Sequence, residues 1–284
     1  MYKRQTWYST LTVPQFQAET GGAEYTDAFQ ATHPEQVFVD GESQVQVAAN
    51  PGAGQFALDG ARRVILGSNP AGRVVEVTTR DKWLLPQAND VTVTGFSMRH
   101  AGTHGQGWAI GNNDQMRFTL RGNVLTDAHG GMVSFGGGDM YTTIADNVIA
   151  RAGNTGIGGY NNGHGLISGN QIYGNGYGGW RWEWQAGGIK TAASRNLMVT
   201  RNTVHDNNGP GIWCDLGCQD VTYADNVVSD LSASGIFFEV STGARITGNR
   251  VQRSGKGDLP GISISSSGNV EVCLLYTSPS PRDS

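Results

Sequence analysis

Two stretches decide the fold: "NTVHDNNGPGIWCD", residues 202–215, and "DNVVSDLSASGIFFEVS", residues 225–241. Each contains an asparagine, an apolar residue two positions later and, after a polar turn, a glycine followed by isoleucine. Matching asparagines stand at positions 123, 147, 170, 202, 226 and 249, at intervals of 24, 23, 32, 24 and 23 residues. Apolar residues at one position of every repeat stack when successive coils lie one strand spacing apart. The repeat therefore predicts a parallel β-helix with about 23–24 residues per coil.

A period of this length also occurs in leucine-rich repeats. Their Leu-x-x-Leu-x-Leu pattern is missing. Where their helix would be needed, apolar and polar residues alternate over segments as long as a strand. The recurring asparagine suits a corner, because asparagine tolerates a left-handed backbone and hydrogen-bonds to the backbone or to the next asparagine. We therefore predict an all-β protein whose β-helix covers residues 87–271.

Together with "NVIARAGNTGIGGY", residues 147–160, these stretches resemble the bacterial right-handed parallel β-helix repeat proteins of the pectate-lyase-like superfamily. The resemblance implies a right-handed solenoid. It does not fix the activity, because that superfamily holds lyases, glycosidases, esterases, epimerases and non-catalytic proteins. The paired-aspartate pattern of the polygalacturonases and the Asp-Pro-His-Asp run of the mannuronan epimerases are missing here.

Residues 37–77 alternate short apolar runs with Asp-Gly and Asn-Pro turn signals. They predict a small antiparallel β module within residues 6–86, which also hold the first coil or coils. The module resembles the one near the start of some β-helix glycoside hydrolases. Alternatively, it caps the open end of the solenoid, which such folds need.

The two ends differ from the rest of the chain. Back-translation of "CLLYTS", residues 273–278, contains the reverse complement of DNA that encodes "MYKRQ", residues 1–5. Inverted copies of one DNA sequence are typical of transposon adapters used in library preparation. We expect residues 1–5 and 272–284 to be adapter-derived, and the native part to be a fragment.

Composition narrows the class of partner. A net charge of -4 gives no basic footprint for nucleic acid, and no apolar run is long enough to span a membrane. Cys214 and Cys218 form a candidate disulfide, whereas a zinc site lacks a second Cys or His pair. We expect a monomer that is secreted or at the cell surface and binds a polysaccharide or oligosaccharide.

One coil carries an insertion. The interval from Asn170 to Asn202 is nine residues longer than its neighbours, and the excess falls in "GGWRWEWQ", residues 178–185. If the insertion is extended, alternation places Trp180, Trp182 and Trp184 on one side. Their rings would then form a wall that stacks on sugars. Alternatively, they plug a groove of the solenoid.

The strand after the insertion supplies candidate catalytic residues. Aligning coils on their Gly-Ile pairs places Lys190, Trp213 and Phe237 outward, and two residues later Ala192, Asp215 and Glu239. Asp215 and Glu239 then lie about 5 Å apart on adjacent coils. Like charges at that distance push one pKa up, which provides an acid and a carboxylate. Trp213 would contact the sugar. The alternative is a solvated face or a cation site.

Three further residues are predicted to flank this cleft or, alternatively, to form a hydrogen-bonded corner: His205, Asp206 and Arg253. The remaining histidines lie in turns at spacings that predict no metal site, so we assign none.

Three functions are compatible with these residues. The first is a glycoside hydrolase that uses Asp215 and Glu239. The second is a polysaccharide lyase with Lys190 as base and calcium held by the two carboxylates, although an acidic chain is poorly suited to a polyanion. The third is a non-catalytic glycan-binding or surface-structural β-helix. No cofactor is expected beyond that calcium.

Overall fold

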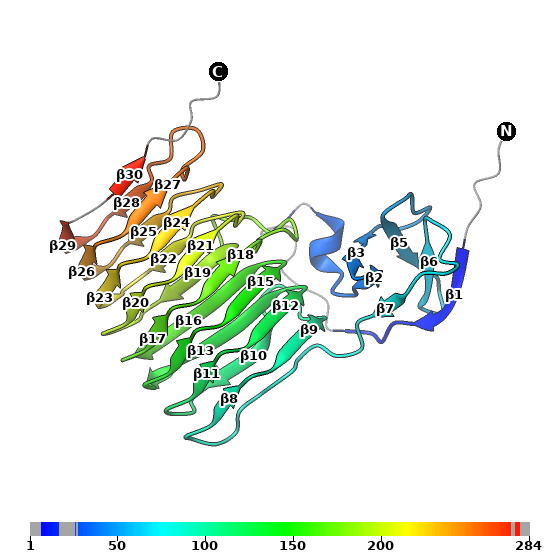
Figure 1. Cartoon of the computed structure of the whole chain (residues 1–284), viewed down its shortest axis with the longest axis horizontal. Coiled ribbons are helices and arrows are strands. Elements are labelled where there is room, and N and C mark those ends of the chain that lie inside the picture. Colours follow the sequence, from blue (N-terminus) through cyan, green and yellow to red (C-terminus); the bar gives the residue numbers. More distant parts are fainter. Residues whose placement is uncertain (1–6, 17–25, 27, 274–275, 279–284) are drawn as a thin grey trace.

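The computed structural model describes residues 7–16, 26, 28–273 and 276–278, and most of them form a solenoid of three parallel sheets (Figure 1). The seven-stranded sheet contains β10 (Trp108–Asn113), β13 (Gly131–Asp139), β16 (Thr155–Gly163), β19 (Gly187–Ala192), β22 (Ile212–Asp215), β25 (Ile236–Glu239) and β28 (Ile262–Ser265).

The other two sheets have eight strands each. The first eight-stranded sheet contains β8 (Thr92–Thr94), β11 (Thr119–Arg121), β14 (Thr143–Ala145), β17 (Leu166–Ser168), β20 (Met198–Thr200), β23 (Gln219–Ala224), β26 (Thr242–Thr247) and β29 (Gly268–Cys273). The second contains β9 (Ser97–Ala101), β12 (Val124–Ala128), β15 (Val148–Ala152), β18 (Gln171–Tyr173), β21 (Thr203–His205), β24 (Val227–Ser229), β27 (Arg250–Gln252) and β30 (Tyr276–Ser278). The predicted all-β parallel β-helix is confirmed.

The core is a stack of apolar side chains in register. On the seven-stranded sheet, one inward position is occupied on successive coils by Val133, Ile157, Ile189, Ile212 and Ile236. All five are at most 2% exposed. Burial of each stabilises the fold by about 1.5–3 kcal/mol, so the Gly-Ile repeat seen in the sequence is the repeat of this core.

A ladder of buried asparagines explains the recurring Asn. Asn170, for example, donates from both its backbone N–H and its side-chain Nδ2 to Oδ1 of Asn202, at 3.0 and 2.9 Å. Asn202 in turn donates to Asn226 in the same way, and its Nδ2 also donates to the carbonyl of Ile167. Each amide thereby satisfies backbone groups at a corner where the chain leaves one sheet for the next.

The N-terminal part forms two small sheets and a short helix. One sheet contains β3 (Glu42–Ser43), β2 (Val37–Val39) and β7 (Val75–Val77); the other contains β1 (Trp7–Thr12), β6 (Arg63–Leu66), β5 (Gln55–Leu58) and β4 (Val45–Gln46). All pairings are antiparallel except β4 with β5. The predicted antiparallel module is confirmed, and the 3-10 helix η1 (Phe29–Thr32) lies between β1 and β2 in the chain.

The module lies against the side of the solenoid. His129 Nε2 lies 2.6 Å from the carbonyl oxygen of Gln30, and Thr26 forms an antiparallel bridge with Trp180. The open end of the seven-stranded sheet is covered instead by Leu84, which bridges Ile110 in parallel. The predicted boundary near residue 86 stays a prediction. The predicted adapter residues 1–5 lie outside the described residues, as do 274–275 and 279–284 of the second adapter segment.

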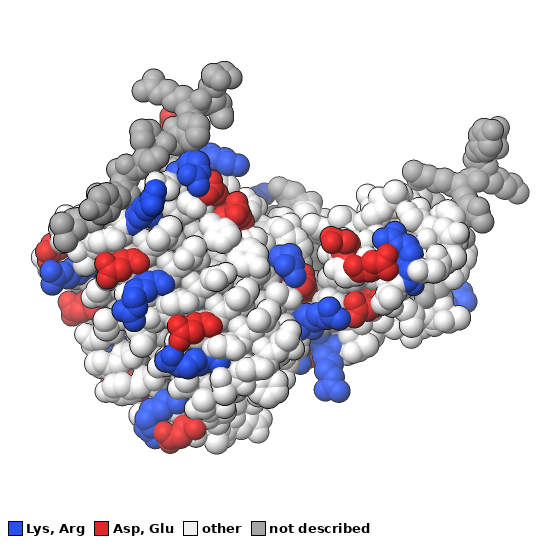
Figure 2. Space-filling view, in the orientation of Figure 1, with Lys and Arg blue, Asp and Glu red and all other residues white. Residues whose placement is uncertain are grey.

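Charges on the face shown in Figure 2 lie side by side in opposite signs rather than in separate areas. Many belong to ion pairs between neighbouring coils, such as Arg121 with Asp146 and Arg253 with Asp230, both at 2.5 Å. Within the described part of the chain, no helix has the length and apolar character to cross a membrane.

Candidate functional site

Two columns of outward side chains run along the seven-stranded sheet. In the first column, strand register aligns Gly111, Ser134, Gly158, Lys190, Trp213 and Phe237. In the second it aligns Asn113, Gly136, Tyr160, Ala192 and Asp215. Glu239 continues the second column, because it follows Phe238, the partner of Cys214. This register agrees with the alignment predicted from the Gly-Ile pairs.

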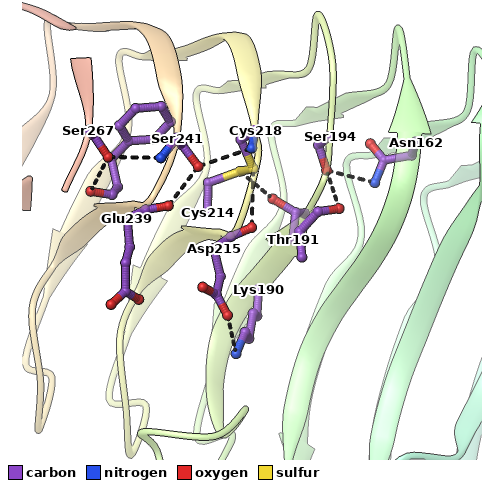
Figure 3. The surroundings of a disulfide bond; sticks show 12 residues. Asn162, Lys190, Thr191, Ser194, Cys214, Asp215, Cys218, Glu239, Ser241 and Ser267 are labelled. Carbon is purple, nitrogen blue, oxygen red and sulfur yellow. Dashed lines mark hydrogen bonds and ion pairs between the residues drawn. A yellow bond between two sulfur atoms is a disulfide. The ribbon is translucent and has the colours of Figure 1, made fainter. Parts of the chain in front are cut away.

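A charged cluster occupies the middle of these columns (Figure 3). Lys190 Nζ lies 3.1 Å from Asp215 Oδ2, and the two side chains are only 15% and 16% exposed. The ammonium also donates to the carbonyl oxygen of Trp184 and stands 3.6 Å from the ring centroid of Trp213. Trp213 stacks on Phe237 at 5.3 Å. The half-buried lysine is thus held by an anion, a carbonyl and an aromatic face.

The two carboxylates of the cluster lie in different electrostatic environments. Burial raises the pKa of Glu239, and the charge of Asp215 raises it further; the indole N–H of Trp213 and the ammonium of Lys190 oppose this only in part. The Trp213 Nε1 approaches Glu239 without forming a well-aligned hydrogen bond, and it has no other partner. Asp215, by contrast, is the ion-pair partner of Lys190. One carboxyl therefore favours its proton, while its neighbour pairs with a cation.

A disulfide fixes the backbone between these residues. Cys214 and Cys218 are joined and close the turn that follows Asp215. The backbone N–H of Cys218 donates to Ser241 Oγ at 3.0 Å, and that hydroxyl donates to the carbonyl of Glu239 at 2.6 Å. Figure 3 shows this link from the disulfide to the Glu239 strand. The candidate disulfide thus ties the two carboxylate-bearing strands together.

Replacing Cys214 and Cys218 by serine is expected to destabilise the protein by about 2 kcal/mol, because the closed loop is short. A urea unfolding curve monitored by circular dichroism measures the shift. Cys273→Ser is the matched control, since Cys273 is a free thiol outside this turn. Equal unfolding midpoints for the double variant and the control would contradict the assigned role.

A cleft of about 660 Å³ leads to the cluster across β10, β13, β16 and β19. Its lining includes Trp108 and Tyr160, and it also includes Gln185 and Lys190. Asp215 and Glu239 lie on the next two coils beyond Lys190. Sequence reasoning missed Trp108 and Tyr160. The available signal was small residues at outward positions, such as Gly136 and Gly158, which leave space above the sheet.

The insertion differs from its prediction. It is not extended: residues 182–185 form a turn, in which the backbone N–H of Gln185 donates to the carbonyl of Arg181 at 3.3 Å. Trp180 is 2% exposed and packs on Ala31 and Ala186, with Trp182 and Trp184 half-buried beside it. The expected extended insertion is therefore wrong, because Trp180 turns inward and fills the contact between the N-terminal part and the solenoid. The alternative, in which the tryptophans plug a groove of the solenoid itself, did not include this contact.

Trp213 is placed outward as predicted, but Lys190 covers its ring and its exposure is 3%. The predicted sugar-stacking surface at Trp213 is therefore wrong, because the cation occupies the ring face that a sugar would need.

The three predicted flanking residues do not reach the cleft. His205 lies on the second eight-stranded sheet, stacks on Tyr173 at 5.0 Å, and has its Nδ1 2.6 Å from Asp206 Oδ2. Arg253 follows β27 of the same sheet and pairs with Asp230. The prediction that they flank the cleft is wrong, and the hydrogen-bonded corner describes them instead. Among the described residues, no three His, Cys, Asp or Glu side chains gather to hold a metal.

The family of right-handed β-helix regions matches residues 108–273, so the chain belongs to that family. Among solved structures, XylC in complex with xylose is similar, with a TM-score of 0.64 and 18% identity over 82% of this chain. This chain spans 51%, about half, of that structure. The A-module of the Azotobacter vinelandii mannuronan C-5 epimerase AlgE4 matches with a TM-score of 0.47 and 13% identity, covering 67% of this chain and 62% of its own.

The enzymatically active domain of tailspike protein 2 from bacteriophage CBA120 matches with a TM-score of 0.48 and 9% identity, over 70% of this chain and 38% of its own. No curated protein sequence matches. At 18% identity, the similarity to the XylC structure shows a shared fold.

Proposed function

We propose that this protein is a glycoside hydrolase that acts on an extracellular polysaccharide, with Glu239 as the acid and Asp215 as its carboxylate partner. The observation that carries the proposal is the placement of these two groups on adjacent coils in opposite environments. Glycoside hydrolysis needs such a pair, one protonated and one ionised, at the scissile bond.

Each member of the cluster then has a role. The protonated Glu239 donates its proton to the oxygen of the leaving sugar. The Asp215 carboxylate stabilises the positive charge that develops on the sugar ring. Lys190 orients Asp215 through the 3.1 Å ion pair. The serine link between Cys218 and the Glu239 carbonyl holds the two strands in register.

The surroundings support a glycan substrate. The cleft beside the cluster is open and bordered by aromatic and amide side chains, which suit the C–H faces and hydroxyl rims of sugars. The xylose bound to a protein of the same fold makes neutral sugars the first probes. A disulfide in the site is typical of a secreted or cell-surface protein, which is where we place this one.

Incubation with a panel of neutral and uronate polysaccharides, followed by mass spectrometry of the products, tests the proposal. We expect fragments that each carry one added water, because hydrolysis places water across the cleaved bond. Unsaturated fragments without added water would overturn hydrolysis in favour of elimination. Binding without fragments from any glycan would overturn the enzymatic proposal altogether.

A lyase is the second candidate, favoured by one observation: burial lowers the pKa of Lys190, which brings it nearer the range of a base. Against it, the ammonium is committed to Asp215 and to the Trp184 carbonyl, and a neutral amine would lose that ion pair. A lyase would release unsaturated products that absorb ultraviolet light, and Lys190→Ala would abolish them.

A further inference from the structure

The far end of the cleft is built around Trp108. This residue begins β10, and its indole extends over the outward surface of the next two coils. A Cβ atom added to Gly131 or to Gly158 would overlap the six-membered ring of that indole. The two glycines therefore leave the space that the ring occupies, and any larger residue at either position would displace it.

Tyr160 stands on the opposite side of the cleft. It is 71% exposed, and its neighbours in the second outward column are the small residues Gly136 and Ala192. An exposed aromatic ring between small neighbours has no packing role within the solenoid. Trp108 and Tyr160 both line the cleft, with Ser134 and Gly158 between their columns as its floor. The two rings therefore border a slot with a small, partly polar base.

The charges of the cleft select against an acidic ligand. Among the residues that line it, the charged side chains are Asp114 and Lys190. The ammonium of Lys190 is already paired with Asp215. A uronate carboxylate in the slot would meet the Asp114 carboxylate and no uncommitted cation among the lining residues. Amide and hydroxyl groups, such as those of Gln106 and Ser134, suit uncharged sugar hydroxyls.

The geometry points to a neutral-sugar subsite between Trp108 and Tyr160, which holds one end of an uncharged oligosaccharide while the chain crosses the coils toward Glu239. The inference rests on the proposed function for the identity of the ligand class. The slot is one coil from Lys190, because Gly158 in its floor pairs with Lys190, and it is three coils from the acid Glu239. A glycan that occupies both must therefore run along the solenoid axis and be several units long.

The test measures binding of neutral xylo-oligosaccharides of two to six units by isothermal titration calorimetry, using the whole chain with Glu239→Gln so that hydrolysis during the titration is slowed. We expect Trp108→Ala and Gly158→Ala each to weaken binding of the longest oligomers about tenfold. Gly158→Ala removes no protein group that contacts the ligand. It weakens binding because the added methyl group displaces the Trp108 indole. Gly60→Ala is the matched control, because a Cβ there meets open space.

Melting temperatures within the parent range establish that the variants fold, and Trp108→Phe, which keeps a ring, should recover part of the affinity. Unchanged binding by both Trp108→Ala and Gly158→Ala would overturn the subsite. Tighter binding of oligogalacturonates than of the neutral oligomers would overturn its preference for uncharged sugars. Ring-dependent binding without hydrolysis by the unsubstituted protein would uphold the subsite and reject the proposed enzyme.

Discussion

Replacing Glu239 by glutamine is expected to lower the rate of glycan hydrolysis by about 10²–10⁴-fold while the fold stays intact. Glutamine matches the shape of the side chain and forms similar hydrogen bonds, but it has no proton to donate to a leaving sugar. Because the protonated Glu239 carries no charge, the substitution leaves the charge beside Asp215 unchanged. Initial rates on the substrate found in the product screen measure the loss, and glycan binding should persist because the cleft is unchanged.

The pH dependence gives a second readout of the same group. Burial and the Asp215 charge raise the pKa of Glu239, so the protonated acid persists to a higher pH than for an ordinary glutamate. Hydrolysis should be fastest below this raised pKa and should decline as the pH rises through it. Glu42→Gln is the control, because Glu42 is exposed on β3, in the N-terminal module. A Glu239→Gln variant that kept the parent rate would rule out Glu239 as the acid.

Replacing Asn202 by alanine is expected to lower the free energy of unfolding by about 3 kcal/mol or more. The substitution removes the acceptor of the buried Asn170 backbone N–H and a donor to the Ile167 carbonyl, and it takes one of three acceptors from the Asn170 side-chain amide. Each unsatisfied buried group costs about 1–3 kcal/mol, and Asn170 and Asn202 are each only 1% exposed. Thermal and urea unfolding measure the change.

Asn208→Ala is the matched control for this prediction. Asn208 lies in the turn after β21, Thr203–His205, and it is exposed. Its side chain donates to the Gly176 carbonyl at the surface, where water can replace it. Asn208→Ala should therefore lower the free energy of unfolding by about 1 kcal/mol or less. If both variants unfolded at the same denaturant concentration, the ladder would not be the main support of the corner.

The fold could be predicted because its pattern is local and repeated. Six coils place an asparagine and an apolar residue at nearly the same spacing, and five of them add a Gly-Ile pair, so many copies of one signal agree. The register followed from that spacing, and with it the neighbouring positions of Lys190, Asp215 and Glu239. A period-two strand fixes the face of each residue once one inward residue is known.

The rest of the site depends on contacts between distant segments. Trp180 is buried because Thr26 and Ala31, about 150 residues earlier in the chain, cover it. A repeat pattern in the sequence cannot predict a contact with a segment outside the repeat. Trp213 was placed on the correct face, but only the structure shows that Lys190 lies over its ring. Trp108 was missed because it begins a strand, where alternation does not yet fix the direction of a side chain.

The two columns of outward side chains present their contacts to a bound glycan at a fixed spacing. Successive positions in a column are one strand spacing, about 4.8 Å, apart, and three such steps separate the strand of Gly158 from that of Glu239. The reach from the aromatic slot to the acid is thus about 14 Å, set by a whole number of coils. Gain or loss of one coil between them would change the distance from the slot to the acid by one strand spacing, without changing the residues of either site. A lineage of such solenoids can therefore change the length of sugar chain it accommodates by copying a repeat, without redesigning either site.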